Sequence, residues 1–166
     1  RRWDPNYSRF SKLVNGGLVG KPYLVEAVCP SGILNSGAHL FDAMEHLAGS
    51  KISAVSGRII HDGSDDPGIC GVVYFDNAMT GFVDCAWKED FMFSIRVRGD
   101  KGEAYIAESP VGVKIFQING MDYPITYHGS PMLCAVENIV DFTTQSDTLR
   151  CSGKNGIRPL WVALAF

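Results

Sequence analysis

Three side chains that can carry protons are spaced along a short segment in the first third of the chain. His39, Asp42 and His46 lie three and four residues apart. At 100° per residue, an α-helix would present all three on one flank. The apolar residues of the segment fall on a different flank, which would anchor the helix in the core: Leu40, Met44 and Leu47. The spacing predicts a helix that holds acid–base groups at a site.

His39 is the residue of this segment best suited to acid–base chemistry. The helix is expected to span about 36–48, to begin near Asn35 and to end at Gly49, so that His39 lies in its first turn. There the helix dipole disfavours an imidazolium, which suits a neutral ring that accepts a proton near pH 7. The alternative is structural, with His39 a surface or capping residue and Asn35 an ordinary N-cap.

A metal site at the same three residues is the weaker interpretation. His39, Asp42 and His46 could share one ion by geometry, but the rest of the sequence offers no evident further ligand. No metal is predicted.

The helices that accompany this segment carry recognisable boundary residues. Asp4-Pro5 and Ser130-Pro131 each supply a capping side chain followed by a proline in the first turn. They predict helices over 5–15 and 131–146, and a last helix begins near Asn155-Gly156. The helix at 131–146 is expected to bury four apolar residues: Leu133, Val136, Val140 and Phe142.

Strands fill most of the remaining chain. They are expected over 22–29, 52–61, 69–75, 79–87, 91–99, 103–107, 111–118 and 121–126, many of them joined by hairpin turns such as Asn119-Gly120. This order predicts an α+β fold, with one large, open, mainly antiparallel sheet and helices packed on one face. The strand–helix–strand segment 22–61 should add a parallel pair. Residues 1–166 form a single domain in this interpretation.

One strand indicates that both faces of the sheet are covered. Residues 79–87 carry apolar side chains in both directions, with Phe82 and Ala86 opposed to Met79, Val83 and Trp87. An apolar outer face requires a partner, so we expect a homo-oligomer formed through the open sheet face.

Composition excludes several classes of protein. The net charge of −3 argues against a protein that binds nucleic acid through a basic surface. The apolar run 160–166 is far shorter than the ~20 residues of a membrane helix. Five cysteines without a CxxC pair indicate reduced thiols in a cytoplasmic protein. The chain opens on Arg1-Arg2-Trp3 and stops within an apolar helical pattern, so we expect a fragment of a longer protein.

The segment Gly37-Ala-His39-Leu-Phe-Asp42 resembles the Gly-x-His-x-x-Asp motif of the glucose–fructose oxidoreductase/inositol dehydrogenase (Gfo/Idh/MocA) family. The order of further segments supports the resemblance along nearly the whole chain, although none is specific alone: Arg1–Tyr7, Leu13–Pro22, His39–Gly49, Val73–Gly81 and Ile95–Gly102. The chain is similar to the C-terminal domain of such proteins.

The resemblance implies an NAD- or NADP-dependent oxidoreductase whose N-terminal Rossmann domain is absent from this chain. Hydride would pass between the nicotinamide and a sugar, polyol or related hydroxy compound. His39 would relay the proton, and Asp42 would orient the substrate or the histidine. Many members carry an aspartate where this chain has Asn35. Asparagine can still hydrogen-bond but cannot ionise, which leaves a non-catalytic binding or oligomerisation module as the alternative.

Weaker candidates lie elsewhere in the chain. Arg1 and Arg2 match a family position near the cofactor, although terminal arginines are commonly just solvated. Trp87 and Lys88 end a strand and could bind substrate, with Trp87 stacking on a sugar ring; burial of Trp87 in the core is the alternative. The acidic run at 61–66 is expected to be a solvated turn.

Overall fold

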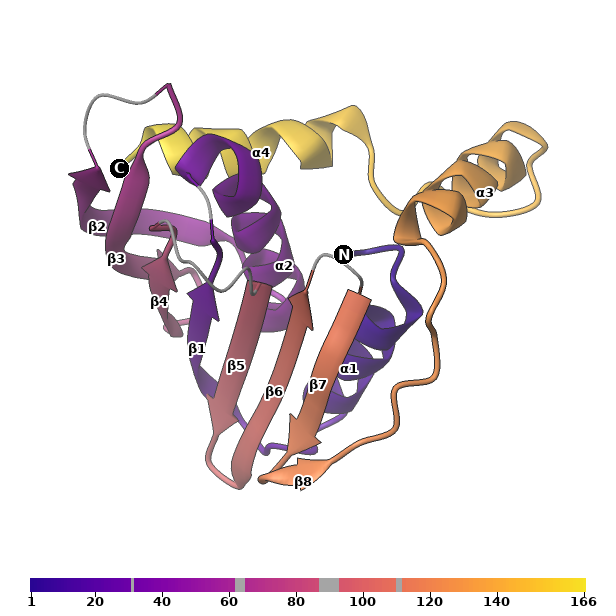
Figure 1. Ribbon diagram of the computed structural model, residues 1–166, viewed down its shortest axis with the longest axis horizontal. Helices are drawn as coiled ribbons and strands as arrows, with labels where there is room; N and C mark the ends of the chain where they lie inside the picture. The colour runs from indigo at the N-terminus through magenta and orange to yellow at the C-terminus, as the bar shows by residue number, and fades with distance from the viewer. Residues whose placement is uncertain (31, 62–64, 87–92, 110–111) are drawn as a thin grey trace.

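One mixed sheet organises the chain (Figure 1). The computed structural model describes residues 1–30, 32–61, 65–86, 93–109 and 112–166. Over these ranges the eight strands lie in the order β2-β3-β4-β1-β5-β6-β7-β8. Their bounds are β1 Pro22–Val28, β2 Ile52–His61, β3 Gly68–Phe75, β4 Thr80–Asp84, β5 Phe93–Gly99, β6 Gly102–Ser109, β7 Gly112–Ile118 and β8 Met121–Asp122. The expected open, mainly antiparallel sheet is confirmed.

The parallel pair joins different strands from those expected. β1 pairs in parallel with β4, and its other neighbour, β5, is antiparallel. The strand–helix–strand segment 22–61 predicted that β1 would pair with β2. Instead, β2 pairs with β3 and β3 pairs with β4, and β1 lies along the other edge of β4. β8 is also shorter than the predicted 121–126, because only Met121 and Asp122 pair with β7.

Two helices cover one face of the sheet: α1 (Pro5–Asn15) and α2 (Ala38–Ala48) (Figure 1). Asp4 caps α1 by accepting a 2.7 Å hydrogen bond from the Asn6 amide, as its Asp-Pro start predicts. The core between helices and sheet includes Phe10, Val14, Leu40, Phe41, Met44, Val25, Ile95, Val97 and Ile106.

The opposite face of the sheet carries exposed aromatic rings beside an ion-pair cluster. Phe82 is exposed whereas Met79 and Val83 are buried, which is the two-sided pattern expected of this strand. Ala86 does not share the outer face: it is buried, because β4 ends at Asp84 and the alternation ends with it. The outer face also carries Tyr74 and an ion-pair cluster of Arg96 and Arg98 with Glu26 and Glu103.

The helix α3 (Pro131–Thr143) extends away from the sheet (Figure 1). Its start at Pro131 was predicted, but its burial was not. Leu133, Val136, Val140 and Phe142 were expected in the core, and all four are exposed. The amphipathic pattern is present, but the described part of the chain places no core against it.

The helix α4 (Gly153–Leu164) lies across α2. Ser152 caps it in a capping box with Asn155, a few residues before the start that was predicted. Arg158 donates to the buried carboxylate of Glu45 on α2 at 2.8 Å and to the Ile52 carbonyl at 2.8 Å. Among the described helices, none is long and apolar enough to cross a membrane.

Candidate active site

The segment that carries Asn35 and His39 begins as a π-helix, η1 (Ile33–Gly37), which continues directly into α2. The Gly37 amide donates across five residues to the Gly32 carbonyl at 3.1 Å. Asp66 accepts hydrogen bonds from the amides of Leu34 at 2.6 Å and Asn35 at 3.2 Å. Asn35 is therefore inside the helical segment rather than its N-cap. Asp66, from the run expected to be a solvated turn, satisfies the first free amides instead.

Glycine at position 37 allows η1 to lie close against the sheet. A Cβ at Gly37 would lie 3.3 Å from the Sγ of Cys85, which follows β4. Cys85 and Cys29 are both buried, and a hydrogen bond to the Cys29 thiol, together with burial, raises the pKa of Cys85. A larger residue at position 37 would require Cys85 or Ile33 to shift by a few tenths of an ångström, so glycine permits this close approach.

The predicted residues Asn35, His39 and Asp42 line one open pocket of about 290 Å³. η1 and α2 supply one wall, and α4 supplies the other together with Cys151, two residues before its start. The residues of the second wall are Cys151, Gly156, Pro159 and Leu160. The structure therefore brings the motif residues His39 and Asp42 together with Asn35, which stands where many family members carry an aspartate.

His39 is exposed to solvent in this pocket, and its pKa lies below the ordinary value. Partial burial is the main cause, the positive charge of Arg1 adds to it, and Asp42 opposes it. The helix dipole was the predicted cause. Because the helical segment begins at Ile33, however, His39 lies beyond its first turn. A neutral imidazole near pH 7 can accept a proton from a hydroxyl group in the pocket.

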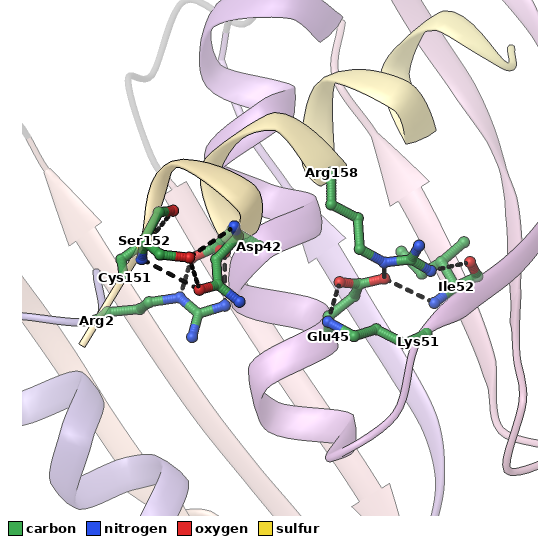
Figure 2. Close-up of polar contacts among 9 residues, drawn as sticks. Arg2, Asp42, Glu45, Lys51, Ile52, Cys151, Ser152 and Arg158 are labelled. Carbon is green, nitrogen blue, oxygen red and sulfur yellow. Dashed lines mark hydrogen bonds and ion pairs between the residues drawn. The ribbon is translucent and has the colours of Figure 1, made fainter. Parts of the chain in front are cut away.

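Asp42 is held by Arg2 (Figure 2). The Nε and Nη2 groups of Arg2 donate to the two carboxylate oxygens at 2.8 Å each, a bidentate pair that fixes the plane of the carboxylate. The same hydrogen bonds raise the pKa of Arg2. Asp42 thus lines the pocket as an oriented anion whose charge Arg2 balances.

Arg1 is also paired within the chain. It forms an ion pair with Glu108, and its guanidinium lies 3.9 Å from the centre of the Phe93 ring. Burial raises the pKa of Glu108 despite this neighbour. Since Arg1 and Arg2 already have carboxylate partners, neither offers an unpaired charge to a dinucleotide. The cofactor-binding role that the resemblance implies for them stays a prediction.

His46 is separated from the pocket that contains His39. It lines an adjoining depression of about 270 Å³ with Arg2, Lys51 and Asn155, and burial, followed by the charge of Arg2, lowers its pKa. Within the described ranges, no group of three or more His, Cys, Asp and Glu side chains could hold a metal ion. Trp87 and Lys88 lie outside the described residues.

The second wall of the pocket and the cap of η1 were not found from the sequence. Cys151 and Leu160 lie more than a hundred residues from His39 in the chain, and no local spacing connects them to it. Pro159, inside α4, was a visible irregularity that could have marked the helix as unusual. Asp66 was noted only as part of an acidic run.

Comparison with solved structures gives matches along almost the whole chain. An oxidoreductase from Thermotoga maritima matches at a TM-score of 0.79 and 15% identity, over 99% of this chain and 56% of its own. The WlbA dehydrogenase from Bordetella pertussis, in complex with NADH and UDP-GlcNAcA, matches at 0.74 and 13%, over 97% and 56%. The aldose-aldose oxidoreductase from Caulobacter crescentus, complexed with glycerol, matches at 0.73 and 18%, over 99% and 58%.

The chain has the fold of the C-terminal domains of Gfo/Idh/MocA-type dehydrogenases. It spans somewhat more than half the length of the solved proteins that it matches. No family model and no curated protein matches the sequence itself. The fold that the motif implied is therefore confirmed by structure.

Proposed function

We propose that this chain is the substrate-side domain of an NAD- or NADP-dependent oxidoreductase that acts on a sugar, polyol or related hydroxy compound. The observation that supports it best is the pocket, where Asn35, His39 and Asp42 converge on a fold that solved dehydrogenases share. About 290 Å³ of open volume lined by these polar groups suits a small hydroxylated molecule.

His39 accepts the hydroxyl proton of the substrate in this proposal. Its lowered pKa keeps the ring neutral and able to accept at pH 7. The Asn35 side chain can donate to, or accept from, a neighbouring hydroxyl, which would orient the substrate without adding charge. Asp42, fixed by Arg2, offers its remaining lone pairs to a second hydroxyl.

The dinucleotide does not fit on the residues of this chain alone. Arg1 and Arg2 are paired, and the sequence lacks a Gly-x-Gly-x-x-Gly turn between a strand and a helix. We therefore assign the cofactor, whose nicotinamide would exchange the hydride, to a Rossmann domain that precedes residue 1 in a longer protein. A cytoplasmic location is part of the same proposal.

Replacing His39 in the longer protein tests the proton relay. His39→Ala should lower kcat/KM for nicotinamide-linked turnover of the best polyol or sugar by ~10²–10⁴-fold, because a positioned general base is lost. The rate of the unaltered enzyme should fall as the pH drops through the lowered pKa of His39, which lies below the ordinary histidine value of about 6.5, and the variant should lack this fall. His46→Ala is the matched control, since His46 lies outside the pocket. An unchanged rate in His39→Ala would remove the catalytic role.

A non-catalytic binding or oligomerisation module is the second candidate function, and Asn35 favours it. A Rossmann fingerprint with a downstream Glu-Lys-Pro in the sequence before residue 1 would favour the enzyme. Loss of the lysine would favour the module.

The outer face of the sheet is proposed to bind a second copy of this chain. Phe82 and Tyr74 are exposed there beside the ion-pair cluster of Arg96 and Arg98 with Glu26 and Glu103. Isolated rings are ordinary on a protein surface, but a mixed apolar and charged face of this kind suits a self-complementary interface.

A further inference from the structure

The two walls of the pocket that contains His39 differ in chemistry. In the described part of the chain, every polar side chain that lines the pocket, apart from one thiol, belongs to the wall of η1 and α2: Asn35, His39 and Asp42. The opposite wall is formed by Cys151, Gly156, Pro159 and Leu160. A bound molecule would therefore find partners for hydroxyl groups along one edge and aliphatic surface along the other.

The backbone of α4 adds no free amide to this second wall. The Gly156 amide already donates to the Ser152 carbonyl at 3.0 Å, and Pro159 has no amide proton. Leu160 lies inside the helix, where each amide binds the carbonyl four residues before it. The part of the wall that α4 supplies is thus apolar in its backbone as well as in its side chains.

The thiol of Cys151 changes this apolar character little. Its sulfur lies 3.7 Å from the Ser152 carbonyl, to which it can donate. Burial, followed by the negative charge of Asp42, raises the pKa of Cys151, so that the group is a neutral thiol at pH 7. A neutral cysteine behaves as a small apolar side chain with a weak donor. The described residues of the second wall therefore carry no charge and no strong hydrogen-bonding side chain.

We propose that the pocket selects a cyclic hydroxy compound with neighbouring hydroxyls on one edge and a hydrocarbon edge opposite, such as an alicyclic diol or a deoxysugar. The inference rests on the proposed function and names the substrate class of the same site. Cβ atoms three residues apart on a helix are about 5–6 Å apart, so His39 and Asp42 can contact hydroxyls on adjacent carbons. The ring edge without hydroxyls would lie against Pro159 and Leu160.

A fully hydroxylated ring fits this arrangement poorly. Hydroxyls that face Pro159 and Leu160 would lose water without gaining a hydrogen bond, and an apolar pocket discriminates against an added hydroxyl by about 10²-fold. Leu160 is 39% exposed, so a hydroxyl beside it would keep some water and a smaller factor is expected. The reaction is the same for either ring: the secondary alcohol becomes a ketone as its hydride passes to the oxidised nicotinamide and its hydroxyl proton to His39.

Steady-state kinetics of the longer protein with two matched rings tests the proposal. The probes are cis-cyclohexane-1,2-diol and myo-inositol, which share one carbon ring and differ in the hydroxyls on the remaining carbons. We expect kcat/KM for the diol to exceed that for inositol by at least about tenfold, because the additional hydroxyls of inositol meet the apolar wall.

A substitution on the second wall should change this ratio. Leu160→Gln places an amide there and should lower the ratio about two- to tenfold, since a net hydrogen bond to inositol becomes available. Glutamine is a good helix former and Leu160 is partly exposed, so α4 should still fold. Ile157→Gln, at an exposed apolar residue of α4 outside the pocket, is the matched control and should leave the ratio unchanged.

The results separate this substrate class from the proposed function. Equal or better use of inositol by the unaltered protein would overturn the substrate class and keep the oxidoreductase. A preference for the diol that Leu160→Gln leaves unchanged would overturn the role assigned to the second wall. If neither ring is turned over, NMR titration of the 166-residue chain decides instead. Larger shifts of the His39 and Leu160 signals with the diol than with inositol would support the preference, and equal shifts would overturn it. Absence of turnover with every sugar and polyol would reject the oxidoreductase alone.

Discussion

Asp42 and Glu45 lie three residues apart on α2, and each is bound by an arginine from a distant part of the chain (Figure 2). The Asp42 side chain is 20% exposed, faces the pocket and is bound by Arg2. The Glu45 side chain is 5% exposed and binds Arg158, the Ile52 amide and Lys51. The partners of Glu45 join α2 to α4 and β2, whereas those of Asp42 leave part of the carboxylate toward an open space.

The difference separates an architectural ion pair from one available for chemistry. A buried carboxylate with a guanidinium and an amide as partners has little capacity left for a ligand, and its removal leaves other groups unsatisfied. A carboxylate at a pocket wall, oriented by one arginine, keeps free lone pairs and a defined direction. Charge alone, as written in the sequence, does not distinguish the two.

The largest effect on stability is expected at Glu45. Glu45→Ala should lower the free energy of unfolding by about 3–5 kcal/mol, because the Arg158 guanidinium and the Ile52 amide lose their acceptor in a buried setting. Denaturant unfolding of the 166-residue chain measures the loss. Lys51→Ala removes a 3.4 Å contact from a half-exposed lysine and should change the stability little. Similar losses for Glu45→Ala and Lys51→Ala would contradict the view that Arg158, rather than Lys51, is the important charged partner of Glu45.

Asp42 should matter less for stability and more for His39. Asp42→Ala is expected to cost about 1–2 kcal/mol, since a partly exposed bidentate pair is lost. Because Asp42 raises the pKa of His39, its removal should lower that pKa further. Proton NMR titration of the imidazole follows this shift. Glu137→Ala, an exposed acidic residue on α3, is the control, and an upward shift of the His39 pKa in Asp42→Ala would reverse our assignment.

The smallest effect is the dependence of stability on pH. His39 and His46 have lowered pKa values in the folded chain, so the unfolded chain binds more protons between those values and about 6.5. Their contribution to stability is complete above about 6.5 and is lost as the pH falls through the folded pKa values. The loss should be small, because both histidines are exposed. The double variant His39→Gln with His46→Gln should flatten the dependence of the free energy of unfolding on pH in this range. An unaltered slope would show that other groups cause the dependence.

Local patterns predicted the elements better than their partners. Asp4-Pro5 and Ser130-Pro131 located helix starts, and period-two alternation located most strands. The pairing of β1 with β4 and the exposure of Leu133 on α3 depend on contacts between distant segments, which no local spacing encodes.

The candidate site was likewise predicted only in the part that one local segment supplies. Helix geometry relates His39 to Asp42, and the structure places both in one pocket together with Asn35. The same geometry predicted His46 beside them, but His46 lines a separate depression. The far wall from α4 and the pairing of Arg2 with Asp42 required the folded chain.

The π-turn of η1 also sets the rotational phase of every side chain after it. A hydrogen bond that spans five residues, from the Gly37 amide to the Gly32 carbonyl, accommodates one more residue than an α-turn would. With one residue fewer, the turn would close as ordinary α-helix and the side chains of α2 would be displaced by about 100° around the axis. Leu40 and Phe41, now in the core, would then compete with His39 for the direction of the pocket. The number of residues in this turn is thus as important for placing an imidazole in the pocket as the presence of histidine at position 39.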